Sequence, residues 1–544
     1  MDLATAHQLV LASIEKGPFE AVKNLILALT VLKYVKYVLA YVRIKGLRGA
    51  IQGFIKHVLQ KTVTFMRAFV PGADKLVAAE VTKNVTSLQK KIVGDIPENL
   101  KQRSLPQKGL PSTAVISELK RLKGMDKIDW KAGKVSGAIY HGGDEVNKLI
   151  TEAFGMYTVS NPLHPELFPG IRQMEAEVVS MVLNMYNAPV EACGSMTSGG
   201  TESLLMAIKT YRDMARELHG VTEPEMILPT TIHTAFDKGA SYFGVKLVHI
   251  PVDARTGEVD LNKVARAINN NTVMIAGSAP NFPHGIIDNI PALAALAKKN
   301  GIPMHVDACL GGFIVPFAEK AGFPLPYCVD FRNEGVTSIS CDTHKYGFAP
   351  KGSSVIMYRT KEIRNFQYFI TTEWPGGVYC SPTIAGSRPG ALVAGCWAAM
   401  MHFGETGYVE STRQIIGAAR AITCGIESIP ELKLIGKPFV SVVAFESSIP
   451  SIKIYGVADL LDKKGWHLNV LQNPPAIHIA CTFLTVKAAS ALVNDLREAV
   501  DLLKKDPTAG NGDVAAIYGT MASVPDRTVI KDVCKGFLDA LTMM

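Results

Sequence analysis

The chain has 544 residues, of which 48% are hydrophobic and 19% are charged. This composition excludes a disordered chain and a low-complexity array, and it supplies enough apolar material for a large core. The net charge is only +8, and the sequence has no basic stripe with interleaved aromatic residues that would indicate nucleic-acid binding. Nine cysteines, none of them paired at the CxxC spacing, predict free thiols and no metal site.

The first informative segment is residues 24–42, NLILALTVLKYVKYVLAYV, which is about as long as a bilayer-spanning helix. Lys33 and Lys36 interrupt it near its centre, where each lysine costs about 2.5 to 3.5 kcal/mol on insertion scales. We favour a single membrane-spanning helix, and a helix lying in the membrane interface is the alternative. The basic residues that follow predict that the rest of the chain is cytoplasmic.

A second basic segment follows at residues 51–70, where apolar residues recur at helical spacing between Lys56, Lys61 and Arg67. This pattern is typical of a helix on a membrane surface or of an amphipathic helix docked on the protein body. Ten Lys or Arg and three acidic residues precede Pro71, so this region carries +7 of the net charge. The remainder of the chain is therefore nearly neutral.

The central region alternates short apolar runs with helix-length segments, which predicts an α/β fold with a mostly parallel sheet covered on both faces. Ligands of such sheets bind at the carboxyl ends of the strands. After about residue 425 the pattern changes to a smaller α+β unit. The strands are expected at 245–250, 273–278, 303–306, 336–341 and 353–358. The domains are expected to be a membrane anchor at 1–70, a helical segment at 71–135, a large domain at 136–425 and a small domain at 426–544.

Two polar features fall at predicted helix starts. Residues 197–203, TSGGTES, would expose backbone N–H groups where the helix dipole favours an anion, although such clusters are also ordinary helix caps. His233 opens the next helix, and its alternative role is that of a structural histidine. Either feature alone is weak evidence for a site.

Two further features fall at predicted strand ends. Asp307 ends a buried strand, where a carboxylate is costly unless it meets a cation or donors, and its alternative role is a helix cap. Lys345 lies in a turn after the strand at 336–341, where loss of solvent can make an amine nucleophilic. A phosphate cradle, a ring-sized side chain, an acid and a lysine are together the parts that pyridoxal phosphate requires.

Five motifs then make the sequence similar to a known family, the sphingosine-1-phosphate lyases. The similarity extends over roughly residues 130–530, and the HVDA and HK elements are shared with glutamate and aromatic amino-acid decarboxylases. The motifs are NPLHPELFPG at 161–170, TSGGTES at 197–203, HVDACLGGF at 305–313, DTHKYGFAPKGSS at 342–354 and SPTIAGSRPG at 381–390.

This resemblance implies a fold type I, aspartate aminotransferase-like enzyme that binds pyridoxal 5'-phosphate. It implies a homodimer with active sites at the subunit interface, in the endoplasmic reticulum membrane. The implied reaction of sphingolipid degradation cleaves the C2–C3 bond of phosphorylated sphingoid bases and yields phosphoethanolamine and a long-chain aldehyde.

The resemblance also implies roles for individual residues. Lys345 would form the Schiff base with the cofactor beside His344, His233 would stack on the ring and Asp307 would pair with the ring nitrogen. Gly200 and Thr201 would hold the cofactor phosphate. The residues expected to contact the substrate or assist proton transfer are Tyr140, His164, Lys351 and Tyr379.

Three questions stay open at this level. An amino-acid decarboxylase would use the same lysine, and an inactive membrane-bound scaffold could keep the same fold. The base that acts on the C3 hydroxyl could be the freed Lys345, a neighbouring histidine or a water linked to Lys351.

Overall fold

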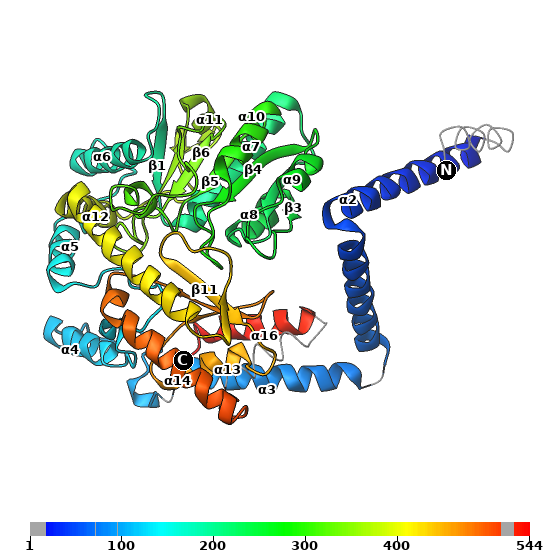
Figure 1. The fold of residues 1–544 in the computed structure, drawn as a ribbon. Coiled ribbons are helices and arrows are strands. Elements are labelled where there is room, and N and C mark those ends of the chain that lie inside the picture. Colours follow the sequence, from blue (N-terminus) through cyan, green and yellow to red (C-terminus); the bar gives the residue numbers. More distant parts are fainter. Residues whose placement is uncertain (1–17, 71, 95, 513–526) are drawn as a thin grey trace. The chain divides into compact units, whose positions relative to one another are not determined.

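The computed structural model describes residues 18–70, 72–94, 96–512 and 527–544 (Figure 1). The chain divides into two compact units. The first is drawn from residues 1–95, 262–267 and 525–544, and its described part is helical; the second comprises residues 96–261 and 268–524. Among the described residues, the strands and the candidate site lie in the second unit.

The helical unit contains α2 (Pro18–Phe69), α3 (Ala73–Val93) and α16 (Arg527–Ala540). The backbone of α2 leaves the helical conformation at Gly46, with φ 72° and ψ 163°, so the two N-terminal segments predicted from the sequence form separate limbs (Figure 1). A positive φ of this size favours glycine. Helix α16 packs on α3, where a Cβ on Gly536 would lie 2.5 Å from the Val85 side chain.

The structure does not support the expected membrane-spanning helix over residues 24–42. Within the described ranges, no helix has a stretch that is both long enough and apolar enough to cross a membrane. The segment is helical as expected. Lys33 and Lys36 interrupt its apolar run near the centre, where charged side chains are costly in a bilayer.

A seven-stranded sheet forms the centre of the second unit, with strand order β1-β7-β6-β5-β4-β2-β3. Strand β7 pairs antiparallel with both of its neighbours, and the other pairings are parallel. The predicted mostly parallel sheet is therefore confirmed, and β3 to β7 coincide with the five predicted strands. The bounds are β1 (Cys193–Thr197), β2 (Glu225–Pro229), β3 (Lys246–Ile250), β4 (Thr272–Ser278), β5 (Met304–Asp307), β6 (Ser338–Cys341) and β7 (Ser354–Tyr358).

Helices cover both faces of this sheet. Side chains alternate between the two faces along a strand, so neighbouring strand residues contact helices on opposite sides. Cys193 and Ala276 belong to the apolar cluster that packs against α7 (Gly200–His219) and α8 (Ala235–Phe243). Their neighbours Gly194 and Gly277 face the opposite side and approach side chains of α6 and α10. The other helices of the second unit before its smaller sheets are α4 (Ser112–Lys123), α5 (Asp144–Met156), α6 (Pro169–Met185), α10 (Ile290–Lys299), α11 (Lys361–Asn365) and α12 (Gly390–Glu427). Helix α9 (Leu261–Ala267) belongs to the first unit from Asn262 onward.

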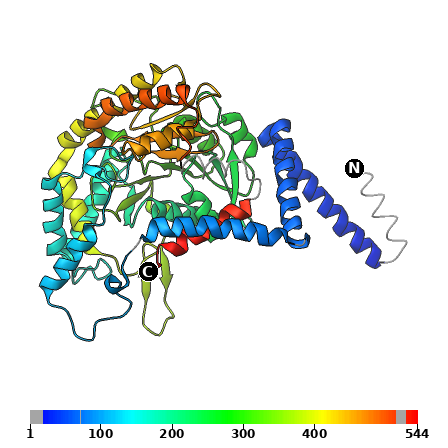
Figure 2. The same ribbon diagram turned by 90° about the horizontal axis from the view of Figure 1, so that it is seen from below.

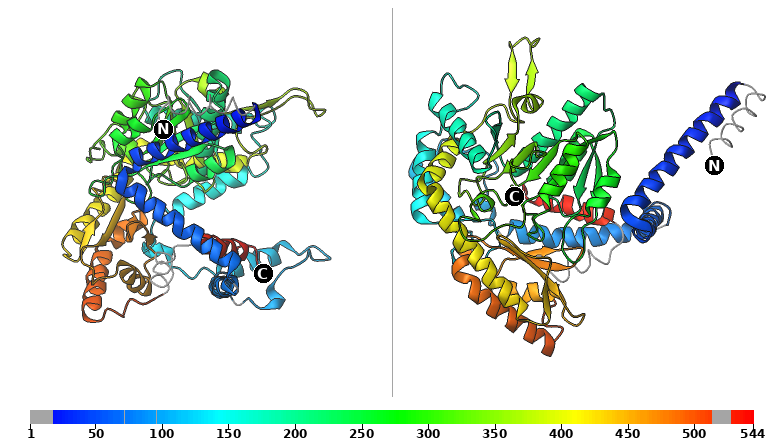
Figure 3. Two further views of the ribbon diagram at one scale, coloured as in Figure 1. Left: turned by 90° about the vertical axis from the view of Figure 1, so that its right-hand side faces the viewer. Right: turned by 45° about the horizontal axis from the view of Figure 1, so that its top comes forward.

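Two smaller sheets complete the second unit. The first is antiparallel, with order β10-β11-β13-β12, and it packs with α12 and α13 (Ile454–Lys463), which in turn contact α14 (Ala489–Lys505). The second is the hairpin of β8 (Phe369–Thr371) and β9 (Tyr379–Ser381), which projects from the surface, as the yellow-green strands in Figures 2 and 3 show. The strands of the antiparallel sheet are β10 (Leu432–Leu434), β11 (Val442–Ser447), β12 (Asn469–Leu471) and β13 (Ala476–Ala480).

Candidate active site

The carboxyl ends of β1, β5 and β6 lead into one cavity of about 290 Å³. This is close to the lower end of the range for small-molecule sites. The position at the carboxyl edge of the sheet is the one that the α/β pattern predicts. The lining residues are Ser198, Gly199, Gly200, Thr201, Glu202, Leu204, His233, Cys309, Asp342, His344 and Lys345.

The start of α7 forms one wall of this cavity. Gly199 precedes the helix with φ 149°, and a Cβ on Gly200 would lie 2.8 Å from both carboxylate oxygens of Asp342 and from Cys309 Sγ. Glycine is thus required for the backbone to approach so closely. The first N–H groups of this 20-residue helix are available to an anion. The structure places the predicted phosphate cradle, including Thr201, on the cavity wall, and its role stays a prediction.

Glu202 is a residue of this wall to which the sequence analysis gave no role. Its carboxylate is buried and accepts hydrogen bonds from the backbone N–H of Ser198 at 2.6 Å and of Ile384 at 3.0 Å. An acidic residue in the first turn of a helix commonly reaches back in this way, which was the available sequence signal. Glu202 therefore fixes the cradle loop and joins it to the segment 381–390.

Lys345 lies opposite a buried acid, with its Nζ 2.9 Å from Asp342 Oδ2. Burial lowers the pKa of Lys345, but the charge of Asp342 raises it, and the net pKa is well above that of an ordinary lysine. Asp342 was not predicted as a site residue from the sequence. It precedes Lys345 by three residues, and only the folded turn brings its carboxylate to the lysine amine.

The two predicted histidines both line the cavity. His344 Nδ1 donates to the carbonyl of Ser353 at 2.5 Å, and its Nε2 lies 3.7 Å from Asp342 Oδ2. Burial lowers the pKa of His344, which favours the neutral imidazole. His233 Nδ1 accepts from the Ala235 N–H at 3.1 Å, which fixes the orientation of the ring.

Asp307 lies beside the cavity wall but is absent from the lining residues. It is 5% exposed, and its Oδ1 accepts from the backbone N–H of Cys309, which does line the cavity, at 3.1 Å. It is the last residue of β5, paired in register with Ser340 of β6. Its predicted partnership with the cofactor ring stays a prediction.

Tyr140 and Lys351 lie together near the cavity. Lys351 Nζ is 4.5 Å from the centre of the Tyr140 ring and donates to the backbone carbonyl of His344 at 3.3 Å. Burial raises the pKa of Tyr140. Loss of hydration and the positive charge of Lys345 lower the pKa of Lys351 to about 8. An amine with this pKa can exchange protons near neutral pH.

The other two predicted substrate residues lie elsewhere in the chain. His164 is exposed, with its Nδ1 3.8 Å from Glu166 Oε1. Tyr379 lies on the β8–β9 hairpin beside Trp374, at 6.2 Å between ring centres. Neither residue lines the cavity of its own chain. Their predicted roles stay predictions.

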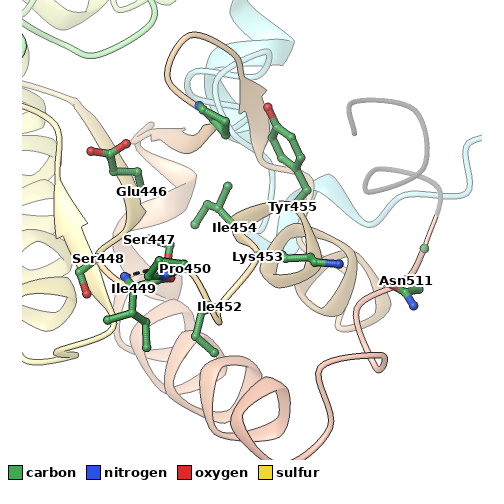
Figure 4. A pocket seen from close by; sticks show the side chains of 12 residues that line it. Glu446, Ser447, Ser448, Ile449, Pro450, Ile452, Lys453, Ile454, Tyr455 and Asn511 are labelled. Atoms are coloured by element: carbon green, nitrogen blue, oxygen red, sulfur yellow. Dashed lines mark hydrogen bonds between the residues drawn. The ribbon is translucent and has the colours of Figure 1, made fainter. Parts of the chain in front are cut away.

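A larger cavity of about 760 Å³ lies elsewhere, between the end of β11 and the start of α13 (Figure 4). Its wall includes Ile449, Ile452 and Ile454, with Glu446 and Lys453 as its charged residues. None of the predicted site residues lines it. The chemistry of this protein is therefore assigned to the smaller cavity.

The residues of the smaller cavity fit pyridoxal phosphate. Lys345 offers an amine, the start of α7 offers an anion cradle, and His233 offers a ring. Within the described residues, Asp342 Oδ1 is buried and has no hydrogen-bond partner, which is a sign of a polar site built for a further group. The fold and this cavity together define an enzyme of the pyridoxal-phosphate-dependent, decarboxylase-like class.

Comparisons with known proteins agree with this class. The sequence matches the pyridoxal-dependent decarboxylase conserved domain over residues 97–448. It is 49% identical over 470 residues to sphingosine-1-phosphate lyase of Saccharomyces cerevisiae, which covers 86% of this chain and 80% of that protein. Sphingosine-1-phosphate lyase 1 of Rattus norvegicus is 45% identical over 471 residues, or 86% of this chain and 82% of that protein.

A solved structure extends the comparison to the fold. Sphingosine-1-phosphate lyase of Burkholderia pseudomallei superposes with a TM-score of 0.72 and 38% sequence identity, covering 78% of this chain and 97% of that one. The chain belongs to the sphingosine-1-phosphate lyase family. The family and the cofactor predicted from the sequence motifs are thus confirmed.

The geometry of the cradle leads to a first prediction. Gly200→Ala should weaken binding of pyridoxal phosphate, because the new Cβ would lie 2.8 Å from the Asp342 carboxylate. The dissociation constant of the cofactor, measured by absorbance on cofactor-free protein, should rise by at least about tenfold.

Gly417→Ala is the matched control, because a Cβ there meets nothing within 4 Å inside α12. Alanine in a helix interior should leave cofactor affinity unchanged and stability equal or higher. An unchanged cofactor affinity in Gly200→Ala would show that the start of α7 is not the cradle.

Proposed function

We propose that this chain is a carbon–carbon lyase of the sphinganine-1-phosphate aldolase type. It cleaves the C2–C3 bond of phosphorylated sphingoid bases and releases phosphoethanolamine and a long-chain aldehyde, a step of sphingolipid degradation. The observation that carries this proposal is the Lys345 amine held by a buried acid on the wall of a cavity with an anion cradle. The family of the chain supports the choice of substrate.

Different residues of the cavity would hold different parts of the cofactor. Pyridoxal phosphate, when bound, supplies the sink for the electron pair of the broken bond. Lys345 would hold it covalently, and the N–H groups at Gly200 and Thr201 would hold its phosphate. His233 would lie against the ring, and Asp307 would pair with the ring nitrogen.

Lys351 is assigned as the base that takes the proton of the C3 hydroxyl. Its pKa is lowered to about 8, so a useful fraction of the amine is free near neutral pH. Lys345, beside Asp342, stays protonated, which suits it to return a proton to C2. The His344 carbonyl accepts from Lys351 Nζ and positions it.

A product assay is the experiment that tests the proposed function. With a phosphorylated sphingoid base, the wild-type protein should release long-chain aldehyde and no CO2, and Lys345→Ala should release neither. Lys320→Ala, which removes a lysine from an exposed ion pair, is the control and should keep full activity. Release of CO2 from an amino acid without aldehyde would make the chain a decarboxylase, and the absence of both products would indicate an inactive scaffold.

The lowered pKa of Lys351 leads to a pH prediction. The amine is protonated below about pH 8 and free above it, so a base at this position gains activity as the pH rises. The value of kcat/KM, which reports the free enzyme, should rise up to about pH 8 and then level.

Lys351→Arg keeps the charge but stays protonated throughout this range. It should lose the rise and lower kcat by about 10²- to 10⁴-fold, as expected for loss of a general base. A wild-type profile that falls through pH 8 would instead give Lys351 a purely cationic role.

We also propose that the chain works as a homodimer with its active sites at the subunit interface. Apolar side chains of the projecting hairpin support this, since Phe369 and Trp374 are each 56% exposed. Exposed apolar groups of this kind favour a protein partner. The substrate residues Tyr379 and His164, which do not line the cavity of their own chain, could then come from the second subunit.

Subunit complementation tests this arrangement. Lys345→Ala and Tyr379→Phe chains are each expected to be inactive alone, and their mixed dimer should recover activity at the one site that keeps both residues. Sedimentation velocity should give twice the chain mass. A monomeric mass, or no recovery in a mixture shown to contain mixed dimers, would contradict the interface site.

For the N-terminal region we propose an interfacial helix on the endoplasmic reticulum membrane, with the catalytic unit in the cytoplasm. Large apolar side chains along α2 are exposed, among them Leu29 at 57%, Leu39 at 61% and Phe54 at 67%. The same region carries most of the net positive charge of the chain. Apolar groups next to basic ones favour the surface of an anionic membrane.

Vesicle flotation tests this placement. The full chain should float with anionic vesicles, and the double variant Leu29→Glu/Leu39→Glu should bind them at least about tenfold less, because charge replaces the inserting groups. Leu105→Glu, at a position 93% exposed outside α2, is the control and should float normally. Equal flotation of both variants would place the membrane contact elsewhere.

A further inference from the structure

The carboxylate of Asp342 lies beside the amine of Lys345 in the interior of the fold. It is 1% exposed, and its Oδ2 lies 2.9 Å from Lys345 Nζ. Its Oδ1 is also buried and, within the part of the chain that the structure describes, has no hydrogen-bond partner. A buried carboxylate with a partner for only one of its two oxygens is costly, and such a group in a folded protein indicates a functional role.

The surroundings of Asp342 direct this charge into the cofactor cavity. Both of its oxygens face the start of α7, because a Cβ on Gly200 would lie 2.8 Å from each. His344 Nε2 is 3.7 Å from Oδ2. The titratable groups that interact with Asp342 and Lys345 are His344 on the same turn, Cys341 at the end of β6, Cys309 after β5, Tyr140 and Lys351.

We propose that Asp342 is a positioning residue for Lys345, whose carboxylate fixes the amine on the cavity wall and keeps a proton on it whenever the amine is not bound to the cofactor. This inference rests on the proposed function, in which Lys345 binds the cofactor. It assigns different acid–base roles to the two lysines. Lys345 donates a proton, and Lys351 acts as the base.

The physical reason lies in two opposing effects. Burial by itself would strip the proton from Lys345, as it does for many lysines in enzyme cavities. The carboxylate of Asp342 reverses that effect and raises the pKa of Lys345. The ammonium held in this way repels a proton from Lys351 and contributes to its lowered pKa. The carboxylate of Asp342 thus raises the pKa of Lys345 directly. It acts on Lys351 in two ways, because its own charge raises the pKa of Lys351 and the Lys345 ammonium that it holds lowers it.

Competitive acetylation of the cofactor-free full chain tests the proposal, because acetic anhydride reacts only with the unprotonated amine. Lys345 of the wild type should label slowly up to about pH 10, whereas in Asp342→Asn it should label at least about tenfold faster at pH 8, which corresponds to a pKa lower by about one unit. Lys351 should label from about pH 8 in the wild type.

Glu405→Gln is the matched control, because it breaks the exposed pair of Lys320 and Glu405, which are 2.6 Å apart. The labelling of Lys345 should be the same in this variant as in the wild type. An identical pH profile of Lys345 in the wild type and in Asp342→Asn would overturn the proposal. The labelling measurement needs no substrate. Its result is therefore independent of the product assay, and the proposed reaction can fail while the role of Asp342 holds.

A second measurement keeps the proposal testable if Asp342→Asn folds poorly. Lys345→Ala leaves the Asp342 carboxylate buried without its cation and should lower the Tm of the cofactor-free protein. Adding Asp342→Asn to this variant removes the unpaired charge and should recover much of the lost Tm. A double variant no more stable than Lys345→Ala would show that the carboxylate does not hold the amine.

Discussion

The site depends on one largely buried ion pair, that of Asp342 with Lys345 after the end of β6. Removing two charges from water is expensive, and their attraction offsets the cost only when the geometry is close. The antiparallel strand β7 and the start of α7 hold the turn that carries both residues. The hydroxyl of Ser354 in β7 donates to the Cys341 carbonyl and is hydrogen-bonded to the Ser203 hydroxyl of α7. The sheet and helix thus fix the amine before any ligand arrives.

From that constraint the chemistry of the cavity follows. Gly200 lets the first turn of α7 approach the pair, which puts an anion cradle beside a protonated amine. Lys351, with its pKa lowered to about 8, reaches the turn of Lys345 by donating to the His344 carbonyl. Two lysines of unlike basicity near the predicted anion cradle support the proposed cleavage of a phosphorylated amino alcohol.

Much of this was predictable from the sequence, because the predicted strands and the helix start at 197–203 follow from local patterns of apolar and small residues. The carboxyl ends of parallel strands lie at the same edge of the sheet, so Gly200, His233, His344 and Lys345 come together there. The roles of Asp342 and Glu202 escaped detection because each depends on which atoms the fold brings within 3 Å. The spanning helix was expected from length and apolar content, and the two lysines within it weigh against that reading.

The central claim is that Lys345 is the residue that holds the cofactor, and one measurement addresses it directly. The purified protein is loaded with pyridoxal phosphate, reduced with borohydride, digested and mapped by mass spectrometry. We expect a phosphopyridoxyl group at Lys345, on the peptide that contains this residue. The same group on Lys351 or on a lysine outside the cavity, with Lys345 unmodified, would contradict it.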